Sequence, residues 1–216
     1  MADSVTRVQP LSGLKVLDFS TLLPGPLATL ILAEAGAEVL KVERPGTGDD
    51  MRSFPPFVGK ESALFALLNR GKKSLALDLK SPGAWTTLEP LVRSADVLVE
   101  QFRPGVMDRL GLGYATLKTT NPRLVYCSIT GYGQDGPKAN VVGHDLTYLA
   151  EAGVLSQATL GSVPPVLAAD IAGGAYPAVM NILMALRRRD ANGEGTHLDI
   201  AMAEQSLTFA VGGQIG

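Results

Sequence analysis

Two acid/base side chains, His144 and Asp170, stand where a purely structural residue would be unusual. His144 is one of only two histidines in the chain, and the carboxylate of Asp145 follows it directly. Asp170 comes after a short apolar run and precedes an apolar stretch that predicts a helix over 171–188. An imidazole and a carboxylate that face each other can take a proton from one side of a carbon and return one to the other. The pair is the first candidate for catalysis.

Each of these residues also has a structural interpretation. Asp170 could cap the helix 171–188 by accepting hydrogen bonds from its free backbone N–H groups, and His144 could simply begin a helix. Capping and catalysis are compatible for Asp170, because a helix N-terminus helps to keep a carboxylate ionised. The second histidine, His197, is predicted to lie on a strand near a turn, and we assign it no role.

The elements that must position the pair alternate between strands and helices. A βαβ unit over 14–43 opens the chain, and residues 44–60, rich in Pro and Gly, predict one long surface loop. The pattern predicts strands over 14–19, 38–43, 74–79, 96–100 and 123–129, with helices over 27–35 and 81–94. Strands separated by helices indicate an α/β fold with a Rossmann-like, doubly wound parallel sheet flanked by helices.

Ligands of such sheets bind beyond the carboxyl ends of the strands. Arg44, Lys80 and the segment 100–103 each follow a predicted strand end. Phosphate oxygens suit arginine and lysine in such positions, although a solvated surface is the alternative interpretation for any one of these cations. The basic residues that could gather around an anionic ligand are Arg44, Arg70, Lys72, Lys73, Lys80, Arg103 and Arg109.

Several common cofactors are disfavoured by the motifs. The first strand runs into Ser20–Pro26, which lacks the G-x-G-x-x-G fingerprint of dinucleotide sites. The sequence has no P-loop and no Cys/His cluster with metal-ligand spacing. We therefore expect no NAD, ATP or metal site.

Composition and charge predict a soluble, cytoplasmic protein. The net charge of −2, with 19% charged residues, argues against a nucleic-acid surface or a polybasic membrane patch. The single Cys127 precludes an intrachain disulfide and favours a reducing compartment. The first residues have no signal-peptide pattern. The apolar stretch 22–32 is interrupted by Pro24 and Pro26 and is too short to span a membrane.

Five sequence motifs in order resemble the class III CoA-transferase family, which includes formyl-CoA and carnitine-CoA transferases and α-methylacyl-CoA racemases. The motifs are residues 11–19, 41–49, 69–74, 100–105 and 131–137. The resemblance implies no prosthetic group and coenzyme A as part of an acyl-CoA substrate. Lys72 and Lys73 belong to one motif but are weaker candidates for contact. The implied CoA-binding residues are Arg44, Leu77, Asp78, Leu79, Lys80, Glu100, Gln101, Phe102, Arg103, Arg109 and Tyr148.

The resemblance gives the candidate pair two possible meanings. Asp170 matches an aspartate used throughout the family: in the transferases it is a nucleophile that forms an aspartyl-CoA thioester, and in the racemases it moves a proton. The stretch 143–148 is similar to the racemase version, in which the histidine is the second base. His144 thus favours an acyl-CoA racemase acting at the α carbon of a 2-methylacyl-CoA. A CoA transferase and an inactive CoA-binding module are the alternatives.

The resemblance also bears on domains and partners. We expect an N-terminal tail over 1–10, a CoA-binding large domain over 11–200, and a helix or linker over 201–216 that leads to a small domain outside this sequence. Family members continue well beyond this point and form interlocked dimers. The expected partners are therefore a second copy of the chain, or another chain that supplies the small domain, and neither nucleic acid nor membrane.

Overall fold

A six-stranded parallel sheet forms the centre of the computed structural model, which describes residues 9–158 and 162–211. The strand order is β5-β2-β1-β6-β7-β8, and every neighbouring pair is parallel. The order reverses between β1 and β6, as in doubly wound folds. The predicted fold class is confirmed. The strands are β1 (Lys15–Asp18), β2 (Glu38–Glu43), β5 (Lys73–Ala76), β6 (Val97–Glu100), β7 (Val125–Thr130) and β8 (Thr196–Ala201).

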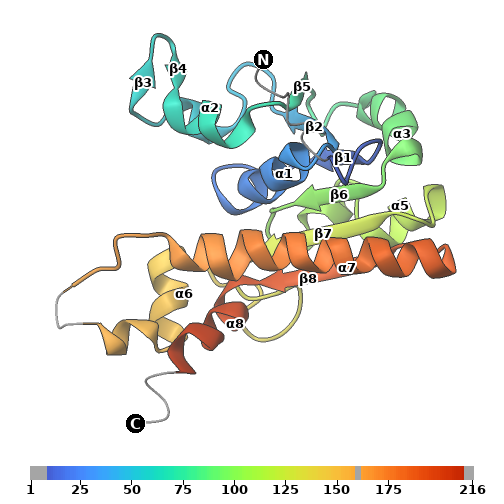
Figure 1. Ribbon diagram of the computed structural model, residues 1–216. Helices are drawn as coiled ribbons and strands as arrows, with labels where there is room; N and C mark the ends of the chain where they lie inside the picture. Colours follow the sequence, from blue (N-terminus) through green and yellow to red (C-terminus); the bar gives the residue numbers. More distant parts are fainter. Residues whose placement is uncertain (1–8, 159–161, 212–216) are drawn as a thin grey trace, which may run out of the picture.

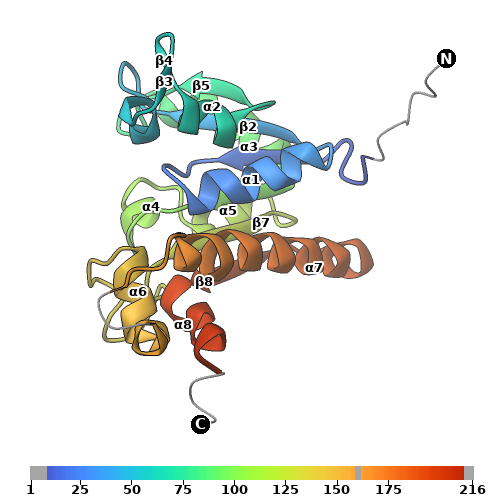
Figure 2. The ribbon, with the colours of Figure 1, turned by 60° about the vertical axis from the view of Figure 1, so that its left-hand side comes forward.

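Helices cover both faces of the sheet (Figure 1). On one face, α1 (Pro24–Glu34) and α7 (Tyr176–Asn192) lie side by side (Figure 2) and bury residues such as Val99 and Cys127. On the other face, α3 (Ala84–Ser94) and α5 (Tyr114–Thr120) pack on residues such as Leu98. Alternate strand residues thus serve two separate cores, because successive side chains of a strand point to opposite faces.

The remaining helices are short. They are α2 (Ala63–Asn69), α4 (Val106–Arg109), α6 (Asp145–Glu151), α8 (Met202–Ser206), and the 3₁₀ turns η1 (Asp50–Ser53), η2 (Val154–Gln157) and η4 (Leu207–Ala210). A π-helical segment, η3 (Ala169–Ala175), leads directly into α7. It contacts α1, α6 and α8.

Some predicted boundaries were wrong. The predicted strand 74–79 ends at Ala76, so residues 77–79 follow the strand rather than belong to it. The predicted loop 44–60 contains η1 and part of a hairpin formed by β3 (Phe57–Val58) and β4 (Glu61–Ser62). The predicted helix 171–188 begins with the π-helical segment and ends at Asn192, where Gly193 adopts φ 81°. The left-handed conformation at the C-terminal end of a helix favours glycine, which has no Cβ. The predicted end of the large domain near residue 200 stays a prediction.

A buried ionic cluster joins the first strands and accounts for one predicted cation. Lys72 Nζ lies 3.1 Å from Asp18 Oδ2 and also donates to the Pro26 carbonyl. Lys41 lies 2.9 Å from Asp49. Burial acts to raise the pKa of Asp18, but Lys41 and Lys72 outweigh it and lower that pKa to about 2. Lys72 therefore stabilises the scaffold and is not available to a phosphate, contrary to its place among the predicted ligand-binding cations.

One segment, Ala169–Asn192, is long and apolar enough to cross a membrane by length and composition alone. Of its most apolar stretch, 56% is buried inside the domain, and Ile182 packs in the core below β7. A core helix of a globular domain buries its apolar residues in the same way.

Candidate active site

The two candidate acid/base residues line one cavity at the carboxyl ends of β1, β6 and β7. This central cavity has a volume of about 500 Å³. His144 and Asp170 are 26 residues apart in the chain, and they reach the cavity from the start of α6 and from the π-helical segment, two elements that are in contact in space. Its other lining residues include Thr21, Leu22, Pro24, Gln101, Phe102, Arg103, Gly143, Tyr148 and Met202.

His144 is placed at the N-cap of α6. Its backbone N–H points to Thr147 Oγ1 at 3.4 Å, and its carbonyl accepts from the N–H groups of Thr147 and Tyr148. The residue is exposed, and the preceding Val142 is 61% exposed. The main chain thus fixes the position of His144, and its exposed side chain lines the cavity.

Asp170 lies within the π-helical segment and not at its N-cap, which is Ala168. The interpretation of Asp170 as a helix cap is therefore wrong. Two glycines let the segment pack closely: a Cβ at Gly173 would come 2.8 Å from the Met202 carbonyl oxygen, and one at Gly174 would come 3.0 Å from Pro24 Cβ. π-helical turns often occur at functional sites, and this one presents the Asp170 side chain to the cavity.

The surroundings of Asp170 favour a base that works near neutral pH. Burial and then the charge of Asp145 raise its pKa to about 6, against a smaller lowering by His144. Among the described residues, no ion pair joins His144 to Asp170. The two groups share the cavity without neutralising each other directly, which leaves each of them able to act on a bound molecule.

Tyr148, predicted to contact CoA, is a buried residue that supports the turn before α6. Its hydroxyl donates to the Gly143 carbonyl at 2.7 Å, and its ring meets Tyr132 edge-on. Burial and then Asp170 raise its pKa to about 12. Tyr148 does line the central cavity, but its hydroxyl already has a partner within the protein.

Most of the predicted CoA-binding residues surround the central cavity or a smaller one beside it. The smaller one, the β2 cavity, has a volume of about 190 Å³ and shares Phe102 with the central cavity. Arg44, Leu77 and Leu79 line the β2 cavity. Gln101 and Arg103 line the central cavity, where Gln101 Oε1 also accepts from the Gly25 N–H at 2.9 Å.

Four predicted contacts line neither of these two cavities: Glu100, which is described below, and Asp78, Lys80 and Arg109. The last three lie on the surface, and Asp78 Oδ1 accepts from the Lys80 N–H at 2.9 Å. Arg44 is also exposed, and its guanidinium pairs with Asp50. A phosphate that bound Arg44 would have to compete with this aspartate.

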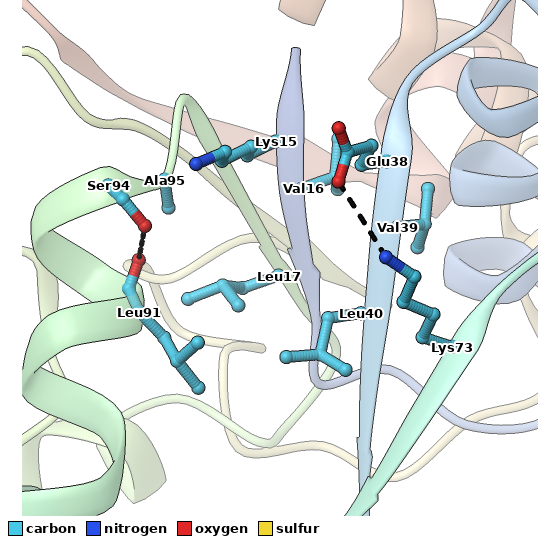
Figure 3. Close-up of a pocket in the computed structure, with 10 residues that line it drawn as sticks. All are labelled: Lys15, Val16, Leu17, Glu38, Val39, Leu40, Lys73, Leu91, Ser94 and Ala95. Atoms are coloured by element: carbon cyan, nitrogen blue, oxygen red, sulfur yellow. Dashed lines mark hydrogen bonds and ion pairs between the residues drawn. The ribbon is translucent and has the colours of Figure 1, made fainter. Parts of the chain in front are cut away.

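Two more predicted cations lie away from the site. Arg70 pairs with Glu34 on α1. Lys73 begins β5 and lies 3.8 Å from Glu38, beside a groove at the amino ends of the strands (Figure 3). Parallel strands place their amino and carboxyl ends at opposite edges of the sheet, so Lys73 cannot serve a ligand at the carboxyl edge. The prediction that Arg70 and Lys73 could gather with the other cations around one anionic ligand was therefore wrong.

A third cavity, the β8 cavity, contains Glu100 and His197. It has a volume of about 300 Å³ and shares Arg103 with the central cavity. Ser128 Oγ lies 2.9 Å from His197 Nε2, and Glu100 accepts from the Phe102 N–H at 2.8 Å. Burial raises the pKa of Glu100 to about 7, although hydrogen bonds from Ser128 and Phe102 lower it. Glu100 thus holds the segment that carries Gln101 and Phe102.

The raised pKa of Glu100 predicts a measurable pH dependence of stability. The folded protein holds this proton more tightly than the unfolded chain, whose glutamate has a pKa near 4.5. The free energy of unfolding should therefore fall as pH rises from about 4.5 to 7. Glu100→Gln removes this contribution, so its stability relative to wild type should increase over that range by at most roughly 3 kcal/mol.

Urea unfolding at a series of pH values measures this difference, and the other titrating groups cancel between the two proteins. The control is the exposed Glu194→Gln, which should follow wild type at every pH. Parallel stability curves for Glu100→Gln and wild type would contradict the prediction.

Two features of the site were missed by the sequence reasoning. The carboxylate of Asp145 accepts from the Asp170 N–H at 2.9 Å, a contact that only the tertiary structure creates. Leu22 has φ 64°, which is rare for a bulky residue. Its N–H donates to Asp49 Oδ1 at 3.0 Å, and the residue lines the central cavity. Neither residue carries a local sequence signal for these roles.

Comparison with known proteins decides the family. Residues 11–213 match the CoA-transferase family III. The chain belongs to this family. The acetyl-CoA:oxalate CoA-transferase of Acetobacter aceti is 42% identical over 93% of the chain and 52% of that protein. The human alpha-methylacyl-CoA racemase is 40% identical over 90% of the chain and 48% of that protein.

The fold agrees with solved members of the family. A CAIB/BAIF family protein from Brucella suis superposes with a TM-score of 0.91 and 34% identity, over 97% of the chain and 57% of that protein. The chain spans about half the length of the curated relatives it matches. Relatives named as transferases and as racemases have similar identities to the chain, so family membership does not decide between these two names.

Proposed function

We propose that the chain is the CoA-binding half of an acyl-CoA racemase that inverts the α carbon of a 2-methylacyl-CoA thioester by proton transfer. The observation that carries the proposal is the presence of two acid/base groups, His144 and Asp170, on one cavity. A nucleophilic aspartate alone would suffice for acyl transfer, whereas inversion at carbon needs a second base.

The reaction divides into two proton transfers. One base removes the α proton, and the electron pair of the broken C–H bond moves into the thioester to give an enolate. The other base then donates a proton to the opposite face of the carbon. For one enantiomer Asp170 is the base and His144 the acid, and for the other enantiomer the roles exchange. A carboxyl with a pKa near 6 can do both at neutral pH.

Substrate binding is assigned to the carboxyl edge of the sheet. The β2 cavity, with Arg44, Leu77 and Leu79, would take part of the CoA moiety, and Gln101 to Arg103 would lead its thioester end to the central cavity. We expect a second copy of the chain, or another chain, to complete the acyl-binding side. No metal or prosthetic group is required by these steps.

The test is exchange of the α proton. A panel of (2R)- and (2S)-2-methylacyl-CoAs in D₂O should gain α deuterium and lose optical purity, as followed by mass spectrometry and by chiral analysis. An acyl-CoA that binds but gains no deuterium, with no transfer to an acceptor acid, would instead identify an inactive CoA-binding module and overturn the proposal.

A CoA transferase is the second candidate, because curated relatives named as CoA-transferases are as similar as the racemases. In that reaction the Asp170 carboxylate attacks the thioester carbonyl, CoA leaves and then returns to the aspartyl carbonyl, and the acyl group departs as a free acid. Trapping distinguishes the candidates: hydroxylamine or borohydride intercepts an aspartyl-CoA thioester, and a racemase yields no such adduct.

A further inference from the structure

A single buried carboxylate connects the two candidate bases. Asp145 is the first residue of α6 and directly follows His144. Asp145 is only 4% exposed, and its Oδ1 accepts a hydrogen bond from the Asp170 backbone N–H at 2.9 Å. This contact ties the beginning of α6 to the beginning of the π-helical segment.

We propose that Asp145 is a positioning residue that holds Asp170, through its backbone, in register with His144 across the central cavity. The inference rests on the proposed racemase function and deepens it, because it names the group that sets the relative placement of the two bases. Asp145 itself is not among the residues that line the cavity.

Backbone chemistry explains why this tether matters. N–H groups in the first turn of a helical segment have no carbonyl partner within it. In this chain, the free N–H of Asp170 is satisfied by an anion, and hydrogen bonds to an ionised acceptor are stronger than neutral ones. Without Asp145, the N–H of Asp170 would have to find another partner, and the first π-helical turn could move.

A second feature separates this carboxylate from an ordinary helix cap. Asp145 Oδ2 is buried and has no hydrogen-bond partner among the residues that the structure describes. An unsatisfied buried oxygen lowers stability, so packing alone does not explain this second oxygen, and the bond from Oδ1 to the Asp170 N–H is what the carboxylate contributes. Its charge also acts on Asp170: together with burial it raises the pKa of that residue, against a smaller lowering by His144. The other charged or titratable residues that line the cavity are Tyr148, Asp50 and Arg103.

Two variants separate position from charge. Asp145→Asn keeps a side-chain oxygen that can accept from the Asp170 N–H but removes the charge. Asp145→Ala removes both. We expect kcat for α-proton exchange to fall about 10- to 100-fold in Asp145→Ala, because small displacements of a base have effects of this size. In Asp145→Asn, kcat should remain within about 3-fold, while the acid limb of the kcat/KM profile shifts to lower pH.

Amide hydrogen exchange gives a readout that does not depend on activity. Residues 169–171 should lose protection in Asp145→Ala and keep it in Asp145→Asn. The matched control is Asp190→Asn, an exposed aspartate at the far end of α7, which should change neither exchange nor kinetics. Thermal unfolding shows whether each variant folds. If Asp145→Ala does not fold, the test is made with Asp145→Asn alone.

Unchanged protection of 169–171 in Asp145→Ala would overturn the proposal, as would loss of that protection in a folded Asp145→Asn. Absence of α-proton exchange in the wild-type protein would instead overturn the racemase function. The amide exchange would then still decide whether Asp145 positions Asp170.

Discussion

Asp170→Asn is expected to abolish racemisation, with a loss in kcat of about 10³-fold or more. The amide side chain is nearly isosteric but cannot accept the α proton. The backbone N–H of Asp170 keeps its bond to Asp145, so the variant should fold like wild type. The measurement is loss of optical purity of a single enantiomer of 2-methylacyl-CoA, followed by chiral analysis.

The same variant makes a sharper prediction for exchange. With His144 intact, the enantiomer whose α proton faces the imidazole should still exchange that proton for deuterium, while the other enantiomer should not. A nucleophilic Asp170 predicts instead that Asp170→Asn loses every activity together. Asp190→Asn is the matched control and should retain wild-type rates.

The pH profile adds a test of the base. Because the pKa of Asp170 is raised to about 6, proton abstraction by its carboxylate needs pH above that value. For the enantiomer that Asp170 deprotonates, kcat/KM should rise about tenfold per pH unit below 6. A profile flat from pH 5 to 8 for that enantiomer would contradict the assignment.

The sequence was sufficient to predict the sheet and to select the two candidate bases. Apolar strands separated by helices determine a parallel sheet whatever the details of the connections, and β1, β2, β6 and β7 lie within two residues of their predicted bounds. His144 and Asp170 were found because an acid and an imidazole among small or apolar neighbours are unusual. Their presence on one cavity follows from the packing of α6 against η3, which no local pattern encodes.

The cations show why the rest could not be predicted. Lys72 and Lys73 are adjacent and equally basic, yet Lys72 is buried against Asp18 and Lys73 is exposed at the opposite edge of the sheet from the site. Composition cannot distinguish a lysine that neutralises a buried aspartate from one that is free to bind a phosphate, because the environment of each lysine is set by residues distant in the chain. The π-helical turn at Asp170 has the same origin: Gly173 and Gly174 permit it, but contacts with α1 and α8 fix it.

His144→Asn is the variant that distinguishes the two reactions of this family. If His144 is a base, racemisation should fall about 10³-fold, while the enantiomer whose proton Asp170 takes should still exchange with solvent at a rate near that of wild type. The result is the mirror image of Asp170→Asn. Together the two variants assign one face of the α carbon to each residue.

The alternative predicts a different pattern for the same protein. If the reaction is CoA transfer, His144→Asn should retain the aspartyl-CoA adduct and most of the transfer rate, because Asp170 alone attacks the thioester. His197→Asn is the matched control, since it removes the only other histidine of the chain from the β8 cavity and should leave both exchange rates unchanged. If each residue is the base for one face of the α carbon, His144→Asn should stop exchange for one enantiomer only. Equal loss of exchange for both enantiomers would therefore contradict a role of the imidazole as one of two independent bases.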